Sequence, residues 1–368
     1  MFLAIASLYF VGLPLYEGTG VLCRTSGGAQ SFGYQEVGGT NKYFYTVIEA
    51  NKDPKNSPTF IVLPGGPGLS AMGLTLTGME PCLLNENGTL QDSMYSWTKF
   101  ANGIWVDAPG TTGFSQGKVE NTMEEWVDNL FILVSGVLKK YPTINHKVYL
   151  VAISFDASTA GMLAAKISRS KAAIDLRGIF MMSGLTGPTD IYLGCLMKAR
   201  KEGLVLYDVR VAPGAKNLEK MFKYKTGNPT VQKAMGVSKK WVGLDRQVLD
   251  SLTRFGAYNT TASITEALDA GLRILVVHGD ADYITNAEGG LFWMSRLAGR
   301  FSYGKQLNAA PEQPLKVGDE MIGTARMAKF SNNAKFGYVK VKDSGHMLLR
   351  NRPRGMKVLA NKFMSFAE

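Results

Sequence analysis

Short apolar runs alternate along the chain with segments in which apolar residues recur every three or four positions. The runs at residues 59–63, 147–153 and 274–277 have the length and composition of buried strands. After the second run, apolar residues recur at helical spacing between positions 160 and 167. Buried strands followed by helices are typical of an α/β fold, in which helices flank a mostly parallel sheet.

Ser154 lies at the boundary between the second run and the following helix, so the pattern places it on a strand-to-helix corner. Such a corner lifts a hydroxyl above the sheet, and the next amide, that of Phe155, points to the place where a tetrahedral oxyanion would form. Ala152 and Asp156 stand where the G-x-S-x-G motif of such corners has glycines. Taken alone, this motif also allows an ordinary serine at the end of a strand.

Two acidic residues, Asp280 and Asp282, end the third run in a turn. Either one can orient a histidine, or simply shape the turn by hydrogen bonds to the backbone. We assign the orienting role to Asp282, because an acid followed by one residue and then an aliphatic residue is typical of such loops. Asp280 is then expected to shape the turn.

A serine mechanism also needs a general base, and the chain has three histidines. His146 precedes a strand and His278 lies at the end of one, whereas His346 lies in a loop after the strand-like residues 336–341. Elimination therefore favours His346 as the base. The order serine, aspartate, histidine along the chain is typical of α/β-hydrolases and predicts nucleophilic acyl transfer.

Further motifs occur in order along most of the chain. They are Phe32-Gly33-Tyr34, Asn41-Lys42-Tyr43-Phe44-Tyr45, Pro64-Gly65-Gly66-Pro67-Gly68, Tyr95-Ser96-Trp97, Asp107-Ala108-Pro109-Gly110-Thr111-Thr112-Gly113-Phe114-Ser115, Pro229-Thr230-Val231-Gln232-Lys233-Ala234-Met235-Gly236-Val237, Gly279-Asp280-Ala281-Asp282-Tyr283-Ile284-Thr285-Asn286, Asn308-Ala309-Ala310-Pro311 and Gly345-His346-Met347. With these motifs and the serine corner, the chain resembles the serine carboxypeptidase family.

The resemblance implies an α/β-hydrolase fold with a mostly parallel central sheet flanked by helices. It implies that Ser154 is the nucleophile, His346 the general base and Asp282 the acid that orients it. The expected function is that of a serine-type carboxypeptidase, which releases C-terminal residues from peptides through an acyl-enzyme on Ser154. No metal or organic cofactor is implied, and the expected partner is a peptide substrate.

The resemblance also implies an oxyanion hole built from the backbone amides of Gly66 and Phe155. The pair Gly65-Gly66 suits this role, because residues without a Cβ atom let an amide approach a substrate carbonyl closely. Gly65 is accordingly placed among the substrate-binding residues. A plain turn after the run at 59–63 is the alternative interpretation of this glycine-rich segment.

Three departures from the family bear on substrate choice. In the family, an asparagine and two glutamates help bind the terminal carboxylate of the substrate, and here their positions correspond to Pro64, Gly78 and Ile153. None of these replaces the lost side-chain hydrogen bonds. As a hypothesis, Arg350 or Arg352, which follow the histidine loop, capture the carboxylate instead, because a guanidinium is its natural bidentate partner.

These departures keep two other functions open. The first is an esterase, another peptidase or an acyltransferase that uses the same three residues. The second is a non-catalytic binding protein with this fold, which Asp156 favours because a carboxylate beside Phe155 would oppose a developing oxyanion.

Composition narrows the class of partner. The chain has 368 residues, of which 45% are hydrophobic and 19% charged, as expected of a globular protein. Its formal net charge is +11, but the lysines and arginines are scattered along the chain. The longest unbroken basic runs are pairs such as Lys139-Lys140. A dedicated nucleic-acid surface is therefore not expected.

We expect the chain to divide into a signal peptide at 1–20, a hydrolase core at 21–189, a short helical cap at 190–226 and the rest of the core at 227–368. The apolar residues 1–13 carry the first assignment, although a buried N-terminal strand is an alternative. No run is long enough for a stable membrane insertion. Tyr192, Leu193, Leu196 and Met197 have the spacing of a cap helix, shorter than the family's usual insertion.

Cysteines and sequons bear on location. The three cysteines, Cys23, Cys82 and Cys195, allow at most one disulfide within the chain. N-glycosylation sequons begin at Asn87 and Asn259. With the apolar N-terminus, they predict the secretory pathway, and an extracellular or vacuolar/lysosomal destination.

Overall fold

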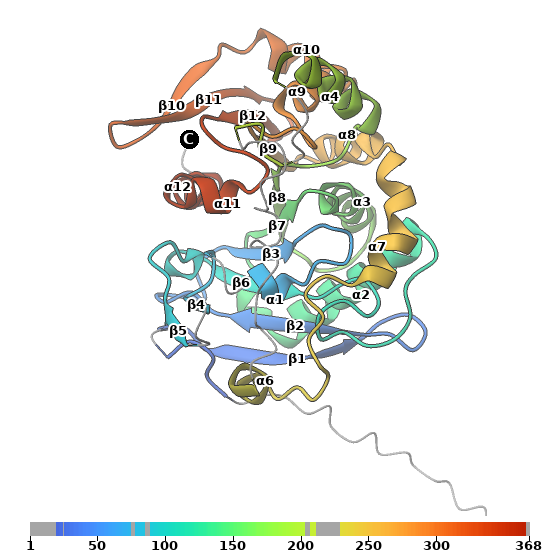
Figure 1. Ribbon diagram of the computed structural model, residues 1–368, viewed down its shortest axis with the longest axis vertical. Helices are drawn as coiled ribbons and strands as arrows, with labels where there is room; N and C mark the ends of the chain where they lie inside the picture. Colours follow the sequence, from blue (N-terminus) through green and yellow to red (C-terminus); the bar gives the residue numbers. More distant parts are fainter. Residues whose placement is uncertain are drawn as a thin grey trace, which may run out of the picture.

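The structure is a computed structural model, and it describes residues 20–24, 26–74, 78–84, 89–202, 207–210 and 229–365. Ten strands form one sheet in the order β1-β2-β6-β3-β7-β8-β9-β12-β11-β10, and two more form a small hairpin (Figure 1). The strands are β1 (Gln30–Glu36), β2 (Lys42–Ile48), β3 (Thr59–Leu63), β4 (Cys82–Leu84), β5 (Leu90–Asp92), β6 (Asn102–Val106), β7 (Val148–Ile153), β8 (Leu176–Met182), β9 (Arg273–Gly279), β10 (Gln313–Val317), β11 (Glu320–Lys329) and β12 (Lys335–Val341).

The middle of the large sheet is parallel and its edges are antiparallel. The strands from β6 to β12 in the spatial order run parallel, whereas β1, β2, β10 and β11 pair antiparallel with their neighbours. Every residue of β3 and β7 is buried, because helices cover both faces of the sheet at these strands. This burial explains their unbroken apolar runs, and the predicted mostly parallel sheet is confirmed.

Helices cover both faces of the sheet. The α-helices are α1 (Ala71–Leu74), α2 (Met123–Lys140), α3 (Asp156–Arg169), α4 (Pro188–Glu202), α6 (Pro229–Met235), α7 (Arg246–Leu252), α8 (Thr261–Asp269), α9 (Ala287–Ser295), α10 (Tyr303–Ala309), α11 (Leu348–Asn351) and α12 (Pro353–Met364), and the 3-10 helices are η1 (Trp97–Lys99), η2 (Pro142–Ile144) and η3 (Thr253–Ala257). In Figure 1, α11 and α12 lie on one side of the sheet, and α2, α3 and α8 lie on the other.

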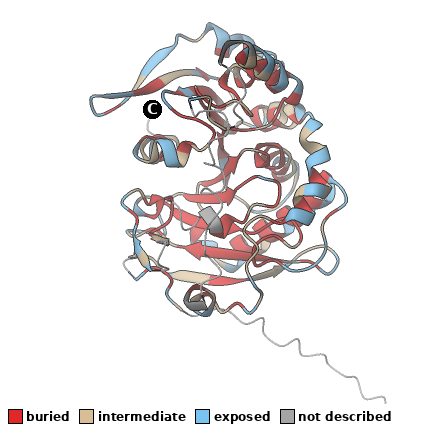
Figure 2. Cartoon of the chain, in the orientation of Figure 1, coloured by how far each residue is buried: buried red, intermediate tan, exposed pale blue. Residues whose placement is uncertain are grey.

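Each face of the sheet has its own hydrophobic core. The larger core joins the sheet to α2, α3, α8, α9 and α10, and the second joins it to α12 through residues such as Met356 and Met364. Figure 2 shows the resulting pattern, with buried residues along the sheet and exposed residues on the outer sides of the helices. The sheet is therefore a rigid support for the loops at its strand ends.

The described part of the predicted cap contains one helix and a short segment. The helix α4 spans the residues with helical spacing, and Tyr192, Leu193, Leu196 and Met197 are exposed on it. The free thiol of Cys195 on the same helix donates a hydrogen bond to the carbonyl of Tyr283 at 3.1 Å. The described segment 207–210 contacts the loops after β9 and β12, whereas 203–206 and 211–226 lie outside the described residues.

A disulfide joins Cys23 to Cys82 in β4. Three cysteines allow at most one disulfide within the chain, and this is the one that forms. Of the predicted signal peptide, residues 1–19 lie outside the described part, as does the sequon at Asn87, whereas Asn259 is exposed. Among the helices that the structure describes, none is long and apolar enough to cross a membrane.

Candidate active site

Ser154 occupies a sharp turn between β7 and α3. Its φ angle is +54°, in the left-handed region that residues with a side chain seldom adopt. The end of β8 holds this conformation, because Ser154 N–H donates to the carbonyl of Met182 at 3.0 Å and its own carbonyl accepts from Leu185 N–H at 2.9 Å. A strained serine at a strand-to-helix turn is typical of a nucleophile elbow, as the apolar pattern predicted.

The elbow is in close contact with the glycine-rich loop after β3. A Cβ atom on Gly65 would lie 2.5 Å from the carbonyl oxygen of Ile153 and 3.0 Å from Cβ of Ser154. The φ angle of Gly65 is +92°, which also disfavours any residue with a side chain. Glycine is therefore required at this position, since nothing larger lets the loop approach the serine.

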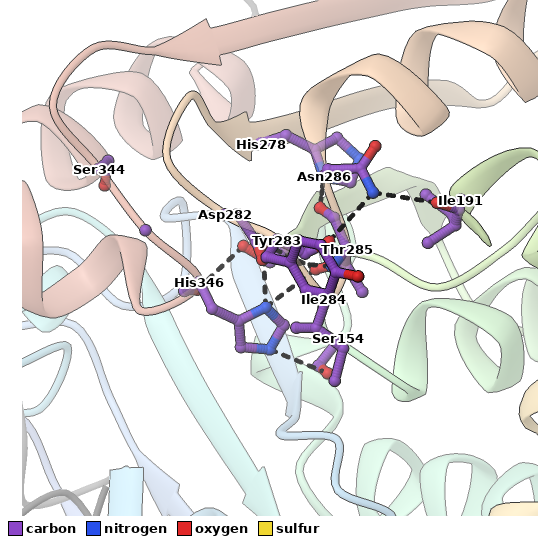
Figure 3. Close-up of polar contacts among 12 residues, drawn as sticks. Ser154, Ile191, His278, Asp282, Tyr283, Ile284, Thr285, Asn286, Ser344 and His346 are labelled. Carbon is purple, nitrogen blue, oxygen red and sulfur yellow. Dashed lines mark hydrogen bonds and ion pairs between the residues drawn. The ribbon is translucent and has the colours of Figure 1, made fainter. Parts of the chain in front are cut away.

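The structure brings Ser154, His346 and Asp282 together across three strand ends. The Ser154 hydroxyl lies 3.1 Å from Nε2 of His346, and Nδ1 of His346 lies 2.9 Å from Oδ2 of Asp282 (Figure 3). Asp282 follows β9 and is fully buried, and His346 follows β12 and is 6% exposed. Nδ1–H of the imidazole therefore donates to the carboxylate, which leaves Nε2 free to accept the serine hydrogen.

Asp280 connects the acid loop to the histidine loop instead of contacting the histidine. Its two carboxylate oxygens accept from the backbone N–H groups of Asp343 and Ser344, at 3.1 and 3.0 Å. The backbone of His346 is held separately, because its N–H donates to the carbonyl of Tyr207 at 2.8 Å and its carbonyl accepts from the Ser183 hydroxyl at 2.9 Å. The imidazole is thus fixed from both sides of its loop.

Thr285 is a member of this network that the sequence interpretation missed. Its hydroxyl donates to Oδ2 of Asp282 at 2.7 Å and lies 2.9 Å from Nδ1 of His346, from which it can accept (Figure 3). Its N–H also donates to Oδ1 of Asp282, at 3.2 Å. A threonine three residues after an aspartate is a common turn arrangement, and this spacing was the available signal.

The electrostatics favour a charged Asp282 beside a neutral second histidine. Burial alone would raise the pKa of Asp282, but the charge of His346 and the hydrogen bonds from His346 and Thr285 outweigh burial and hold this pKa below its usual value. His278 is fully buried, and burial lowers its pKa, so it stays neutral. Its Nδ1–H donates to the carbonyl of Thr285 at 2.7 Å, which supports the acid loop.

The two amides expected to form the oxyanion hole have no acceptor in the part of the chain that the structure describes. Among the described residues, neither Gly66 N–H nor Phe155 N–H donates a hydrogen bond. Gly65 differs from the expectation, because its N–H donates to the Asp156 carboxylate at 2.7 Å and it is not one of the residues that line the cavity. Its amide is therefore not available to a substrate in this arrangement.

A largely apolar cavity opens at Ser154 and His346. It is lined by Pro64, Gly66, Leu69, Ile153, Ser154, Met182, Tyr207, His346, Met347, Leu348 and Leu349. Among these lining residues only the histidine and the tyrosine can ionise. Two of the three departures from the family, Pro64 and Ile153, thus lie at the cavity itself.

The two arginines of the carboxylate hypothesis are not among the residues that line this cavity. Arg350 is exposed. Arg352 forms ion pairs with Glu320 and Asp343, at 3.0 and 3.1 Å, and its Nε–H donates to the carbonyl of Lys342. These partners hold Arg352 against the start of β11 and the loop after β12, so the structure lends the hypothesis no support. Among the described residues there is also no cluster of three metal-ligating side chains.

Comparison with known proteins places this site in a family. The family model described as serine carboxypeptidase matches residues 23–212 and 207–365. The chain belongs to the serine carboxypeptidase family. This membership confirms the predicted relationship and, at the level of the family, the expected serine carboxypeptidase-like hydrolase.

Individual relatives of this serine carboxypeptidase family member are distant. It is 22% identical to Carboxypeptidase Y of Schizosaccharomyces pombe over 91% of this chain and 41% of that protein. It is 23% identical to Serine carboxypeptidase-like 48 of Arabidopsis thaliana over 93% of this chain and 80% of that protein. The chain thus spans less than half of the first relative and most of the second.

A solved structure supports the predicted fold. The prohormone-processing carboxypeptidase Kex1(delta)p of Saccharomyces cerevisiae superimposes with a TM-score of 0.76 at 17% identity, and the match covers 92% of each chain. At this identity the likeness concerns the fold, and the α/β-hydrolase fold predicted from the sequence is confirmed.

Proposed function

We propose that this protein is a serine-type carboxypeptidase-like hydrolase that cleaves peptides through an acyl-enzyme on Ser154. The observation that carries the proposal is the continuous chain of hydrogen bonds from the Ser154 hydroxyl through His346 to the buried Asp282. A serine is a weak nucleophile without an adjacent base, and this arrangement supplies both the base and the acid that orients it.

In the first half of the reaction, Oγ of Ser154 attacks the scissile carbonyl and its proton passes to Nε2 of His346. The negative charge on the resulting oxyanion is stabilised by the N–H groups of Gly66 and Phe155. The imidazolium then gives its proton to the departing amine. The C-terminal part of the peptide leaves, with this amine as its new N-terminus. Asp282 stays ionised throughout and stabilises the imidazolium.

In the second half, water attacks the acyl-enzyme. His346 takes a proton from the water and returns it to Ser154 Oγ as the ester bond breaks, so the enzyme is regenerated and the shortened peptide is released as an acid. If an alcohol or amine takes the place of water, the same steps give acyl transfer. No metal is needed for any of these proton transfers.

The direct test is labelling by a fluorophosphonate probe, which reacts with activated serines, on the wild type and on Ser154→Ala. Turnover of a blocked dipeptide with a free C-terminus is measured on the same preparations. We expect labelling and turnover in the wild type and neither in the variant. A wild-type protein that is folded but unlabelled would refute the proposal.

A second candidate is a hydrolase of the same mechanism without preference for a free carboxylate, such as an esterase or another peptidase. The apolar lining at Pro64 and Ile153 favours it, together with the engagement of Arg352 by Glu320 and Asp343. Comparison of the free-acid dipeptide with its amide and methyl ester separates the two candidates. Turnover confined to the free acid supports a carboxypeptidase, and equal or faster turnover of the neutral substrates supports the second candidate.

For the cellular location, we propose the secretory pathway, with an extracellular or vacuolar/lysosomal destination. The disulfide between Cys23 and Cys82 supports it, because such bonds persist in oxidising compartments. The exposed sequon at Asn259 is compatible with it. Sensitivity of the expressed protein to an N-glycosidase would test the proposal, and a protein found wholly unglycosylated with reduced cysteines would contradict it.

A further inference from the structure

Asp156 is a buried carboxyl group directly behind the serine turn. It is 1% exposed and is the first residue of α3. Its Oδ2 accepts from Gly65 N–H at 2.7 Å, and its Oδ1 lies 3.2 Å from the Thr159 hydroxyl. Burial of a carboxyl group away from water costs free energy, so its contact with the glycine-rich loop should have a physical reason.

The loop that Asp156 contacts carries the expected oxyanion donor. Gly65 and Gly66 have φ angles of +92° and +109°, and two glycines in succession leave the peptide between them free to rotate unless other groups restrain it. Two hydrogen bonds supply the restraint. Gly65 N–H donates to Asp156, and the Gly65 carbonyl accepts from Leu69 N–H at 3.2 Å.

We propose that Asp156 is a positioning residue, which holds the Gly65-Gly66 backbone in the orientation that points Gly66 N–H at the oxyanion. This inference rests on the proposed acyl transfer by Ser154. The peptide before Gly65 is fixed by Asp156 and the peptide after it by Leu69. Without the carboxyl group, the bond from Leu69 N–H at 3.2 Å is the hydrogen bond that remains to these two glycines within the described part of the chain. An oxyanion donor is effective only when it is aligned before the reaction.

The positioning contact does not require a charge on Asp156. Burial raises the pKa of Asp156 to about 7, and the hydrogen bonds from Gly65 and Thr159 only partly oppose this effect. When the carboxyl group is protonated on Oδ1, it can donate to the Thr159 hydroxyl, whose own hydrogen goes to the Asp156 carbonyl at 3.0 Å. The neutral acid therefore keeps the bond to Gly65 without placing a negative charge beside the oxyanion.

Among the described residues, no charged group contributes to the pKa of Asp156. No charged side chain of β3, β7, β8, α2 or α8, the elements that pack against α3, contributes to the pKa of Asp156 among the described residues. The ionisable side chain that reaches Ser154 is His346. Asp156 thus accepts a fixed hydrogen bond from Gly65 N–H and carries little negative charge below neutral pH.

Two substitutions separate the contact from the charge. In Asp156→Asn, the amide oxygen can accept from Gly65 and the amide N–H can donate to Thr159, so the contact persists without any charge. In Asp156→Ala, the contact is lost. Thr159→Val is the matched control, because it removes the other partner of the carboxyl group and leaves the bond to Gly65 in place.

The assay uses a p-nitrophenyl ester and its thionoester analogue, whose sulfur is a poor acceptor for oxyanion-hole donors. For the oxygen ester we expect the kcat of Asp156→Ala to fall about tenfold or more with KM nearly unchanged, and those of Asp156→Asn and Thr159→Val to stay within about threefold of the wild type at pH 6. The ratio of oxygen-ester to thionoester turnover should fall in the alanine variant only. A general loss of structure would lower the turnover of both substrates alike.

The proposal is overturned if Asp156→Ala is folded, as judged by its thermal midpoint, and retains the kcat and the oxygen-to-sulfur ratio of the wild type. It is also overturned if Asp156→Asn loses as much kcat as Asp156→Ala. Failure of the proposed function is distinct, because the wild-type protein itself would then show no turnover and no labelling of Ser154.

Discussion

The contacts of Asp282 allow the effect of Asp282→Asn to be worked out atom by atom. Two donors of Thr285 face the carboxylate, its N–H at Oδ1 and its hydroxyl at Oδ2, and Nδ1–H of His346 also faces Oδ2. Asparagine has one oxygen. If this oxygen took the place of Oδ2, the amide N–H would meet the N–H of Thr285. The oxygen should therefore occupy the Oδ1 position, with the amide nitrogen facing His346.

This orientation gives the histidine the wrong tautomer. An amide N–H that faces Nδ1 of His346 turns that atom into an acceptor, so the ring proton moves to Nε2, where the base must be free. Loss of one hydrogen bond to a charged group accounts for about 1.5–3 kcal/mol, or roughly 10- to 150-fold in kcat. The tautomer adds a further loss, and the total should approach the roughly 10⁴-fold reduction typical of such a change in a serine triad.

The assay is ester hydrolysis by purified Asp282→Asn, with Asp280→Asn as the matched control on the same loop. KM should change little, since the perturbed step is proton transfer. Asp280→Asn should retain most of kcat, because the hydrogen bonds of the Asp280 carboxylate to the described residues join it to the backbone N–H groups of Asp343 and Ser344 and not to His346. The reasoning is refuted if Asp282→Asn keeps kcat within about tenfold of the wild type, or if the Asp280 variant proves the more damaged of the two.

Four other substitutions have defined expectations. Thr285→Val removes one hydrogen-bond partner of the acid and the base, so kcat in ester hydrolysis should fall only about two- to tenfold. Cys23→Ser opens the disulfide to Cys82, and the sequence separation of 59 residues predicts a loss of about 4 kcal/mol in the free energy of unfolding, measured in urea. Arg352→Ala should leave kcat/KM for free-acid dipeptides unchanged, because its partners hold it away from the cavity. The pKa of Asp156 in the fold is about 7, above its usual value, so ionisation opposes folding. Asp156→Asn should therefore stabilise the protein little at pH 4 and increasingly up to pH 8, by at most about 4 kcal/mol in urea titrations.

Each of these four expectations has an outcome that would contradict it. A loss above about 100-fold in Thr285→Val would mean that the hydroxyl, more than the carboxylate, aligns the base. An unchanged unfolding midpoint in Cys23→Ser under oxidising conditions would contradict a formed disulfide. A reduced kcat/KM for free acids in Arg352→Ala would return that side chain to the substrate site. Equal stabilisation by Asp156→Asn at pH 4 and pH 8 would contradict the effect of burial on the pKa of Asp156.

Much of the fold, and Ser154, Asp282 and His346 of the network, could be predicted because each signal is local. The buried strands β3, β7 and β9 are short apolar runs, and the parallel order places their carboxyl ends at one edge of the sheet. Ser154 follows β7, Asp282 follows β9 and His346 follows β12. Residues in that position converge when the strands run parallel close together in one sheet, so their order along the chain was informative.

The contacts that the sequence did not reveal join segments far apart in the chain. The bond from Gly65 to Asp156 spans 91 positions, and the ion pair of Arg352 with Glu320 spans 32. Such pairings depend on the orientation of two loops and on competition between partners. A position after the histidine loop favoured Arg350 or Arg352 for carboxylate binding, but Arg352 forms ion pairs with Glu320 and Asp343. The pairing of Cys23 with Cys82 was open for the same reason.

The role of Asp156 bears directly on the choice between the two proposed substrate classes. A carboxylate that enters an apolar cavity without hydrogen-bond donors loses several kcal/mol of solvation. The lining residues Pro64 and Ile153 offer no side-chain donor, and the amide of Gly65 is already bonded to Asp156. Gly66 N–H is the remaining candidate in this loop, and in the proposed mechanism it binds the oxyanion. Apart from Ser154 and His346, the lining side chain that can donate to a carboxylate is Tyr207. If Tyr207 does not bind the carboxylate, a neutral C-terminal group should bind better than a free acid, and the amide and methyl ester of the test dipeptide should show the lower KM.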